Sequence, residues 1–299
     1  MDKNVVKTVN LSKHYGKTEA LSQLSINIAQ HSITGLIGRN GSGKTTLLKI
    51  LAGILDKTDG KLMVFGHAPM DNLPVLSRLV YTYHNMEYES HLSLKTLLYA
   101  YKTMFPNFDG DFADKLMKYF ELSGNMKYKS LSQGAGSIFN FLCALSCRTE
   151  LTMLDEPVLG MDVATRKAVY EVMLRDFSEH PRTFIISSHL LSEIEGVLSD
   201  ILLLEQGKLL LHNSIDDVRQ SAYRIDGNQQ VIEKFIQEKE IIVQKKNEFS
   251  GFAIVHEPFT ESAAQAAKAQ GLSVSTVRAE DLCVYLTHQN KEDELECLW

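Results

Sequence analysis

Cysteine is scarce in this chain, and its few cysteines lack the spacing of a metal or redox site. The four cysteines among the 299 residues are Cys143, Cys147, Cys283 and Cys297, and none belongs to a Cys-x-x-Cys pair. Cys143 and Cys147 are four residues apart, on one face of a predicted helix. We interpret these two as small buried apolar residues, not as a metal site or a disulfide.

Long apolar stretches are absent too. No apolar run reaches the roughly 18 residues that are needed to cross a bilayer. The first residues, MDKNVVKTVNL, lack the apolar core of a secretion signal. These absences predict a cytosolic protein with reduced thiols, which would act at a membrane only through a partner.

Positive charge is not in excess, because 37 acidic side chains outnumber 31 lysines and arginines and the net charge is −6. The field of the whole chain therefore does not favour nucleic acid or an anionic membrane surface, and no nucleic-acid partner is expected. Sustained heptads, which would indicate a long coiled coil, are missing as well.

Glycine recurs at short spacing in the stretch GRNGSGKTT. Residues 38–45 have the pattern Gly-x-x-x-x-Gly-Lys-Thr of a phosphate-binding loop. Glycines let successive amides converge on phosphate oxygens, and the helix that follows adds its positive dipole end. The predicted nucleotide-binding residues of this loop are Gly38, Asn40, Gly41, Ser42, Gly43, Lys44, Thr45 and Thr46.

The flanking sequence fits this motif. Residues 31–38, HSITGLIG, have the β-branched and apolar character of a buried strand, and residues 45–53, TTLLKILAG, have helical spacing that stops at Gly53. A strand, a glycine loop and a helix in this order are the context that the motif requires.

An acidic pair follows a second predicted strand, LTMLDEP, at residues 151–157. Ligands bind at the carboxyl ends of strands in open α/β sheets, so this pair suits a nucleotide cleft. We expect Asp155, with the Thr45 hydroxyl, to hold Mg²⁺. Glu156 is expected to orient and deprotonate the attacking water, while Lys44 reaches the β and γ phosphates.

Further motifs follow in a fixed order. LSQGA, at residues 131–135, opens an apolar helix, GMD contains Asp162, and the strand TFIISSHL ends near His189. Together with the glycine loop and LTMLDE, this set resembles the ATP-binding subunits of ABC transporters over roughly residues 3–212. The resemblance implies that Ser132 and Gly134 belong to the signature motif, Asp162 to the D-loop and His189 to the switch position. It also implies that Tyr15 stacks on adenine.

The sequence departs from that family's pattern at two places. Gln133 and Ala135 alter the signature motif, and His84 stands where the family has a glutamine that senses Mg²⁺ and couples to the permease. A histidine has one ring acceptor and a titrating charge, unlike a neutral amide. A surface role for His84 and a working substitution both remain open here.

The chain divides in the sequence into two predicted domains. Residues 1–212 form the nucleotide-binding domain, an α/β P-loop NTPase with a RecA-like core and a helical subdomain. Residues 213–299 alternate strands and helices in the order β-α-β-β-α-β, which indicates a small α+β ferredoxin-like module. A dimerisation or regulatory role is our hypothesis for this module.

The resemblance implies an ATPase that uses ATP and Mg²⁺ and pairs with a like chain, identical or not, across two nucleotide sites. We expect a motor subunit on the cytoplasmic face of the cell membrane that powers export of a peptide, toxin or drug through a separate permease. Part of a tyrosine-rich stretch would grip that permease, although packing alone explains any single tyrosine; its tyrosines are Tyr81, Tyr83, Tyr88, Tyr99 and Tyr101. The alternatives are a soluble ATPase of the same type acting on ribosomes or DNA, and a regulatory protein that holds ATP.

Overall fold

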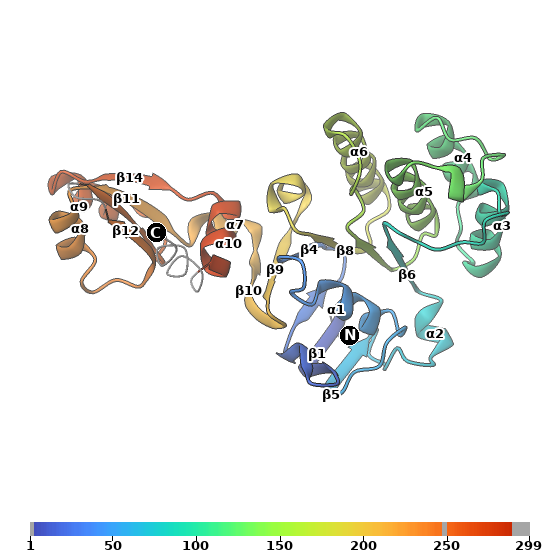
Figure 1. The fold of residues 1–299 in the computed structure, drawn as a ribbon, viewed down its shortest axis with the longest axis horizontal. Helices are drawn as coiled ribbons and strands as arrows, with labels where there is room; N and C mark the ends of the chain where they lie inside the picture. The colour runs from blue at the N-terminus through green and yellow to red at the C-terminus, as the bar shows by residue number, and fades with distance from the viewer. Residues whose placement is uncertain (1–2, 247–249, 289–299) are drawn as a thin grey trace. The chain divides into compact units, whose positions relative to one another are not determined.

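A six-stranded sheet is the centre of the first of two units into which the chain divides, Met1–His212 and Asn213–Trp299 (Figure 1). The structure is a computed structural model that describes residues 3–246 and 250–288. Each unit has its own sheet and its own apolar core. Among the described residues, no helix is both long and apolar enough to cross a membrane.

The inner strands of this central sheet are almost fully buried, as expected for parallel strands covered on both faces, whereas the edge strand β10 (Lys208–Ser214) has no buried residue. The order of the six strands is β10, β9 (Asp200–Glu205), β4 (Ile33–Ile37), β8 (Thr183–Ser188), β7 (Leu151–Asp155) and β6 (Leu79–Tyr83). Neighbours from β9 to β6 are parallel. The strands expected at residues 31–38, 151–157 and 183–190 are confirmed as β4, β7 and β8, every residue of which is buried.

A second sheet is antiparallel and packs on the same core. It contains β2 (Thr18–Leu24), β1 (Asn4–Tyr15), β3 (Asn27–Ala29) and β5 (Asp59–Val64). Helix α1 (Lys44–Leu51) contacts both β2 and β7 and buries its apolar face in this core, which confirms the helix expected after the glycine loop.

Five helices of the first unit come from the middle of its sequence, residues 73–179. They are α2 (Leu73–Leu76), α3 (Leu94–Met104), α4 (Gly110–Tyr119), α5 (Gln133–Ser146) and α6 (Val163–Glu179), with α3, α4 and α5 gathered together in Figure 1. Hydroxyl or carboxylate side chains cap four of these five helices, with Ser93 on α3, Asp109 on α4, Ser132 on α5 and Asp162 on α6.

Cys143 and Cys147 are buried free thiols at the C-terminal end of α5, which confirms the apolar interpretation. Burial raises the pKa of both thiols, so they stay protonated.

The second unit has the expected ferredoxin-like order of elements. Its sheet runs β12 (Ile241–Lys246), β13 (Gly251–Val255), β11 (Tyr223–Gly227) and β14 (Ser273–Thr276). Helices α8 (Gln229–Phe235) and α9 (Glu261–Ala269) pack on this sheet, around a core that includes Tyr223 and Ile225. Two further helices, α7 (Ile215–Gln220) and α10 (Ala279–His288), flank the motif in sequence.

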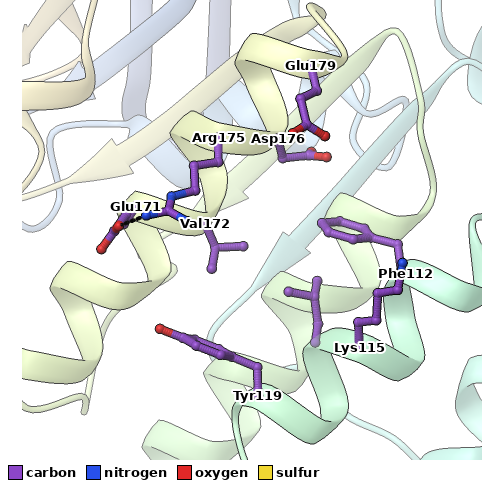
Figure 2. A pocket seen from close by; sticks show the side chains of 9 residues that line it. Phe112, Lys115, Tyr119, Glu171, Val172, Arg175, Asp176 and Glu179 are labelled. Atoms are coloured by element: carbon purple, nitrogen blue, oxygen red, sulfur yellow. Dashed lines mark hydrogen bonds and ion pairs between the residues drawn. The ribbon is translucent and has the colours of Figure 1, made fainter.

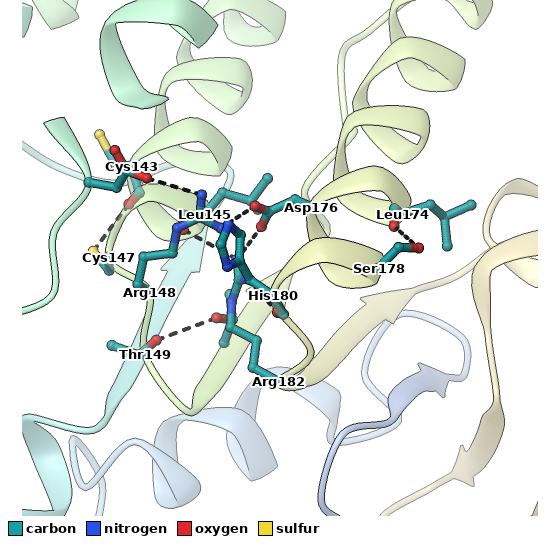
Figure 3. A network of polar contacts seen from close by, with 12 residues as sticks. Cys143, Leu145, Cys147, Arg148, Thr149, Leu174, Asp176, Ser178, His180 and Arg182 are labelled. Atoms are coloured by element: carbon teal, nitrogen blue, oxygen red, sulfur yellow. Dashed lines mark hydrogen bonds and ion pairs between the residues drawn. The ribbon is translucent and has the colours of Figure 1, made fainter. Parts of the chain in front are cut away.

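A buried ionic cluster joins helix α6 to the residues that precede strands β7 and β8 of the central sheet (Figure 3). Asp176 of α6 is 5% exposed and accepts hydrogen bonds from Arg148 and Arg182, the second at 2.5 Å. The Arg148 guanidinium also reaches the Asp109 carboxylate at 3.2 Å and lies over the Phe112 ring of α4. Asp176 thus pairs with two arginines, one shortly before β7 and the other directly before β8, and Asp109 shares the first of them.

We expect Asp176→Asn to destabilise the first unit by roughly 3–5 kcal/mol, because it leaves buried guanidinium charge without a counter-ion. Urea unfolding followed by circular dichroism measures this loss. Glu171→Gln on the same helix is the matched control, since Glu171 and its partner Arg175 have side chains that are 61% and 77% exposed. That control is expected to change stability by about 0.5 kcal/mol or less. Equal midpoints for the two variants would contradict this account of the cluster.

Candidate nucleotide site

A cavity of 510 Å³ lies where the parallel strands end and α1 begins. Parallel strands bring their carboxyl ends to one edge, so the loops that follow β4, β6, β7 and β8 meet there. The cavity is lined by Ala20, Asn40, Gly41, Ser42, Gly43, Lys44, Thr45, Thr46, His84, Glu156, Leu159 and His189. Most of the predicted loop residues therefore lie together with Glu156 and His189.

The glycine loop adopts backbone angles that suit glycine. Gly41 and Gly43 have φ values of 84° and 105°. A Cβ on Gly43 would stand 2.7 Å from the carbonyl oxygen of Ala20, so no larger side chain fits there. Gly43 gives α1 no side-chain cap, which leaves the first amides of the helix available to an anion.

Lys44 is buried at the base of the cavity. Its Nζ donates to the Gly38 carbonyl at 2.6 Å and to the Arg39 carbonyl at 3.3 Å. Burial lowers the pKa of Lys44, and the nearby Glu156 and Asp155 carboxylates oppose that shift. The ammonium group is thus fixed by the loop itself, at the position from which it can meet a phosphate.

Ser42 offers an independent sign that the loop fits a phosphate. The serine lines the cavity and its Oγ is buried, yet the structure gives that oxygen no hydrogen-bond partner among the described residues. A buried hydroxyl without a partner costs free energy, and a phosphate oxygen in the cavity would supply the missing acceptor.

Glu156 lies between a lysine and a histidine. Its Oε1 is 3.8 Å from Lys44 Nζ, and its Oε2 is 2.9 Å from Nδ1 of His189. The backbone of Glu156 is left-handed, with φ of 51°, and its amide donates to Ser187 Oγ at 3.0 Å. Non-glycine residues adopt this conformation at a cost and often at functional sites, where the surroundings hold them in place.

Asp155 is joined to the glycine loop by a hydrogen bond. Thr45 Oγ1 donates to Asp155 Oδ2 at 2.8 Å, and Tyr81 donates to the same oxygen at 3.1 Å. Ser187 of the neighbouring strand donates to Oδ1. A hydroxyl and a carboxylate oxygen side by side are ligands that Mg²⁺ prefers, so Thr45 and Asp155 fit that ion, which would complete its shell with water and phosphate.

His84 lies at the cavity, directly after β6, and so the structure brings the unusual residue to the nucleotide-binding edge. The carbonyl of the preceding Tyr83 accepts a hydrogen bond from the Asn140 amide at 3.0 Å. Asn140 belongs to α5 and is 2% exposed, so a buried contact links that helix to the strand carrying His84.

Six predicted residues lie outside the cavity lining. Gly38 and Asp155 are each hydrogen-bonded to a lining residue, and the other four are Tyr15, Ser132, Gly134 and Asp162. Tyr15 is 49% exposed at the end of β1, with the Lys13 ammonium over its ring. Ser132 and Asp162 cap α5 and α6, and a Cβ on Gly134 would stand 2.7 Å from the carbonyl oxygen of Gly160. Within one chain, Ser132, Gly134 and Asp162 therefore organise the starts of α5 and α6 and do not line the cavity around Lys44.

Sequence reasoning missed four residues of the site, which are Ala20, Leu159, Tyr81 and Ser187. Ser187 lies within the strand predicted at residues 183–190, but its pairing with Asp155 across β7 and β8 is visible only in the structure. Ala20 and Leu159 carry no signal of the site in the sequence.

A second hollow of 410 Å³ lies between α4 and α6 (Figure 2). Phe112, Lys115 and Tyr119 face it from α4, and Glu171 and Arg175 face it from α6. No residue of the expected motifs lines this hollow.

Comparison with known proteins finds relatives that are all ATP-binding proteins of transport systems. The family model described as "ABC transporter" matches residues 21–159. The chain is 28% identical to ABC transporter ATP-binding protein YtrB of Bacillus subtilis, over 74% of this chain and 76% of that one. It is 29% identical to the bacitracin transport ATP-binding protein BcrA of Bacillus licheniformis, over 72% and 71%. Identity is 30% to the zinc uptake system ATP-binding protein ZurA of Listeria monocytogenes, over 67% and 82%.

Solved structures share the fold of the first unit. An ATP-binding subunit of an ABC transporter superposes with a TM-score of 0.64 at 21% identity, over 72% of this chain and 92% of that one. A dimeric ATP-binding cassette in a post-hydrolysis state, bound to ADP and Pi, gives a TM-score of 0.61 at 20% identity, over 70% and 98%.

We expect His84→Gln to leave ATP hydrolysis within a few-fold, because either side chain offers a hydrogen-bonding group at the cavity edge. Steady-state phosphate release with saturating ATP measures the effect. His91→Gln is the control, since the His91 side chain is 69% exposed and outside the cavity. A loss above about a hundredfold in His84→Gln alone, some 2.7 kcal/mol of barrier, would show that His84 is indispensable.

Proposed function

The chain belongs to the ATP-binding proteins of ABC transporters and is an ATPase, and from that premise we propose that it powers export of a peptide, toxin or drug through a separate membrane permease. ATP is the ligand of the cavity at α1. The observation that carries the catalytic part of the proposal is Glu156, held between Lys44 and His189 beside the Asp155–Thr45 pair.

ATP binding follows from the shape of the loop. The amides of residues 41–45 and the Lys44 ammonium meet the β and γ phosphates, and the N-terminus of α1 favours their negative charge. When the phosphates enter, they take over Lys44 from the loop carbonyls at Gly38 and Arg39. The lowered pKa of Lys44 rises again in the presence of phosphate, since opposite charge favours the protonated form.

Hydrolysis then depends on Glu156. Its carboxylate accepts a proton from the attacking water while the water oxygen bonds to the γ-phosphorus. The bond between that phosphorus and the β–γ bridging oxygen breaks, and ADP leaves. His189, hydrogen-bonded to Oε2, orients the carboxylate and can meet the γ-phosphate.

Mg²⁺ fits the oxygens of Thr45 and Asp155, and these two residues would hold it. When bound, the ion neutralises charge on the β and γ phosphate oxygens. The other residues described above bind the nucleotide, orient the Glu156 carboxylate and accept the proton from water.

We propose that two ATPase chains form a dimer, in which each nucleotide site contains residues of both chains. Ser132 and Gly134 do not line the cavity of their own chain, and we propose that they close over the ATP of a partner chain, with Asp162 nearby. A head-to-tail pair with twofold symmetry creates two such sites. The dimeric cassette with a similar fold supports this arrangement. The pair is either identical or made of two related chains.

The permease and the class of substrate are proposed from the relatives. Likeness to the bacitracin transport protein supports transport of a peptide, toxin or drug, while another relative is named for zinc uptake; export is the direction that we propose for this chain. We propose that the chain sits on the cytoplasmic face of the membrane through its permease, and that exposed side chains of the helical segment such as Tyr99 contribute to the contact.

Partner capture tests the transporter role. The full chain is tagged in its native cell, membranes are solubilised in mild detergent, and co-purifying proteins are identified with their stoichiometry. A polytopic membrane protein at equal copy number supports the proposal and identifies the permease. Recovery with ribosomes or DNA-bound proteins instead would favour a soluble ATPase, and recovery of no partner would favour a regulatory ATP-binding protein.

We expect Glu156→Gln to lower the turnover number at least about 100-fold while ATP affinity changes less than about threefold, because the amide cannot accept the proton but keeps the shape. Phosphate release and titration with a fluorescent ATP analogue separate the two effects. Lys44→Ala removes a phosphate contact and, unlike Glu156→Gln, should lower the affinity for ATP in addition to the turnover number. Hydrolysis by Glu156→Gln within tenfold of wild type would argue against Glu156 as the general base.

A further inference from the structure

Tyr81 brings a phenol to the carboxylate of Asp155 from the neighbouring strand. Its hydroxyl donates to Oδ2 at 3.1 Å, the oxygen that also accepts from Thr45 at 2.8 Å. Strand β6 pairs in parallel with β7, with Tyr83 opposite Asp155, so Tyr81 is two residues back along the strand and its side chain leans forward to the site. None of the motifs that identify the nucleotide site contains Tyr81.

Asp155 needs such donors. The residue is 4% exposed, and a buried carboxylate is costly unless hydrogen bonds replace its water shell. Ser187 donates to Oδ1, and Thr45 and Tyr81 donate to Oδ2. Both oxygens are therefore held, one from β8 and the other from α1 and β6.

Tyr81 is suited to a fixed, neutral donor. A phenol has an ordinary pKa of about 10, so the Tyr81 hydroxyl keeps its proton at physiological pH. Its ring packs against the ring of Tyr83, with centroids 5.6 Å apart, which limits the rotation of the side chain. The hydroxyl is thus aimed at one oxygen without adding charge.

We propose that Tyr81 is a positioning residue for the metal-holding carboxylate, acting through Asp155. This inference rests on the proposed use of Mg²⁺ by Thr45 and Asp155. Thr45 would give the ion an oxygen lone pair, while Tyr81 and Ser187 would hold the carboxylate from two other elements. Groups that orient a metal ligand through hydrogen bonds typically change metal affinity about 10–100-fold when removed.

The test is Tyr81→Phe in the full chain, which removes only the hydroxyl. Mn²⁺ serves as the probe, and its affinity is measured by electron paramagnetic resonance in the presence of a non-hydrolysable ATP analogue. We expect Mn²⁺ affinity to fall about tenfold. Affinity for the same analogue without any divalent metal is expected to stay within about twofold, because Tyr81 is not among the residues that line the cavity.

A second readout separates positioning from general damage. The Mg²⁺ concentration for half-maximal hydrolysis should rise by a similar factor, and saturating Mg²⁺ should restore the rate to within about twofold of wild type, since a weakened ligand is overcome by mass action. Tyr83→Phe is the matched control, because among the described residues no hydrogen bond from the Tyr83 hydroxyl is seen while its ring packs on Tyr81. That control should leave Mn²⁺ affinity unchanged.

Three outcomes would overturn the inference. Unchanged Mn²⁺ affinity in Tyr81→Phe would show that the hydroxyl does not position Asp155. An equal loss in Tyr83→Phe would assign the effect to ring packing. Nucleotide binding and hydrolysis by the wild-type chain that do not respond to divalent metal would remove the proposed Mg²⁺ site itself, and the inference with it, which distinguishes that failure from the first two.

Discussion

Asp155 places a negative charge at the end of a buried strand, and the site depends on how that charge is accommodated. Only donors from neighbouring elements can replace its water, and they come from β6, β8 and α1. Each of those hydrogen bonds also fixes an element relative to β7. The bond from Thr45 sets the start of α1 against the sheet, and with it the turn of the glycine loop. A single carboxylate thus joins the glycine loop to strands β6 and β8, which run beside β7.

Glu156, the next residue, points the other way because its backbone turns left-handed directly after the strand ends. This turn aims the carboxylate into the cavity, toward Lys44 and His189, while Asp155 stays within the sheet. The conformation is costly, and the hydrogen bond from the Glu156 amide to Ser187 helps to hold it. Ser187 therefore serves both acidic residues, donating to one carboxylate and accepting from the backbone of the other. Two adjacent acids acquire distinct surroundings from a change in one φ angle.

Part of this arrangement can be predicted from the local sequence, and part of it depends on long-range packing. The glycine loop, the strand before it and the helix after it follow from residue spacing, as does the ferredoxin-like order of the second unit, because each depends on neighbours in the chain. Tyr81 was predicted only as one of several tyrosines near a surface or in packing. Its contact with Asp155 requires knowing that β6 is the strand beside β7, and sheet order is set by long-range packing. The motif residues Ser132, Gly134 and Asp162 were found by pattern, yet in one chain they build helix starts, since pattern does not say which chain a residue serves.

Asn140 shows how the two parts of the first unit are mechanically connected. Its amide nitrogen donates to the Tyr83 carbonyl and to the Tyr128 hydroxyl, from the middle of α5. Its side-chain oxygen is buried without a partner among residues 3–246 and 250–288, so the amide orientation is set by the two acceptors alone. Tyr83 immediately precedes His84, and Ser132 begins the same helix that carries Asn140. A displacement of α5 relative to β6 would break a buried hydrogen bond, which costs more than an exposed one, because no water replaces it. The start of α5 and the strand that presents His84 to the cavity are therefore held together by an interaction that resists independent movement.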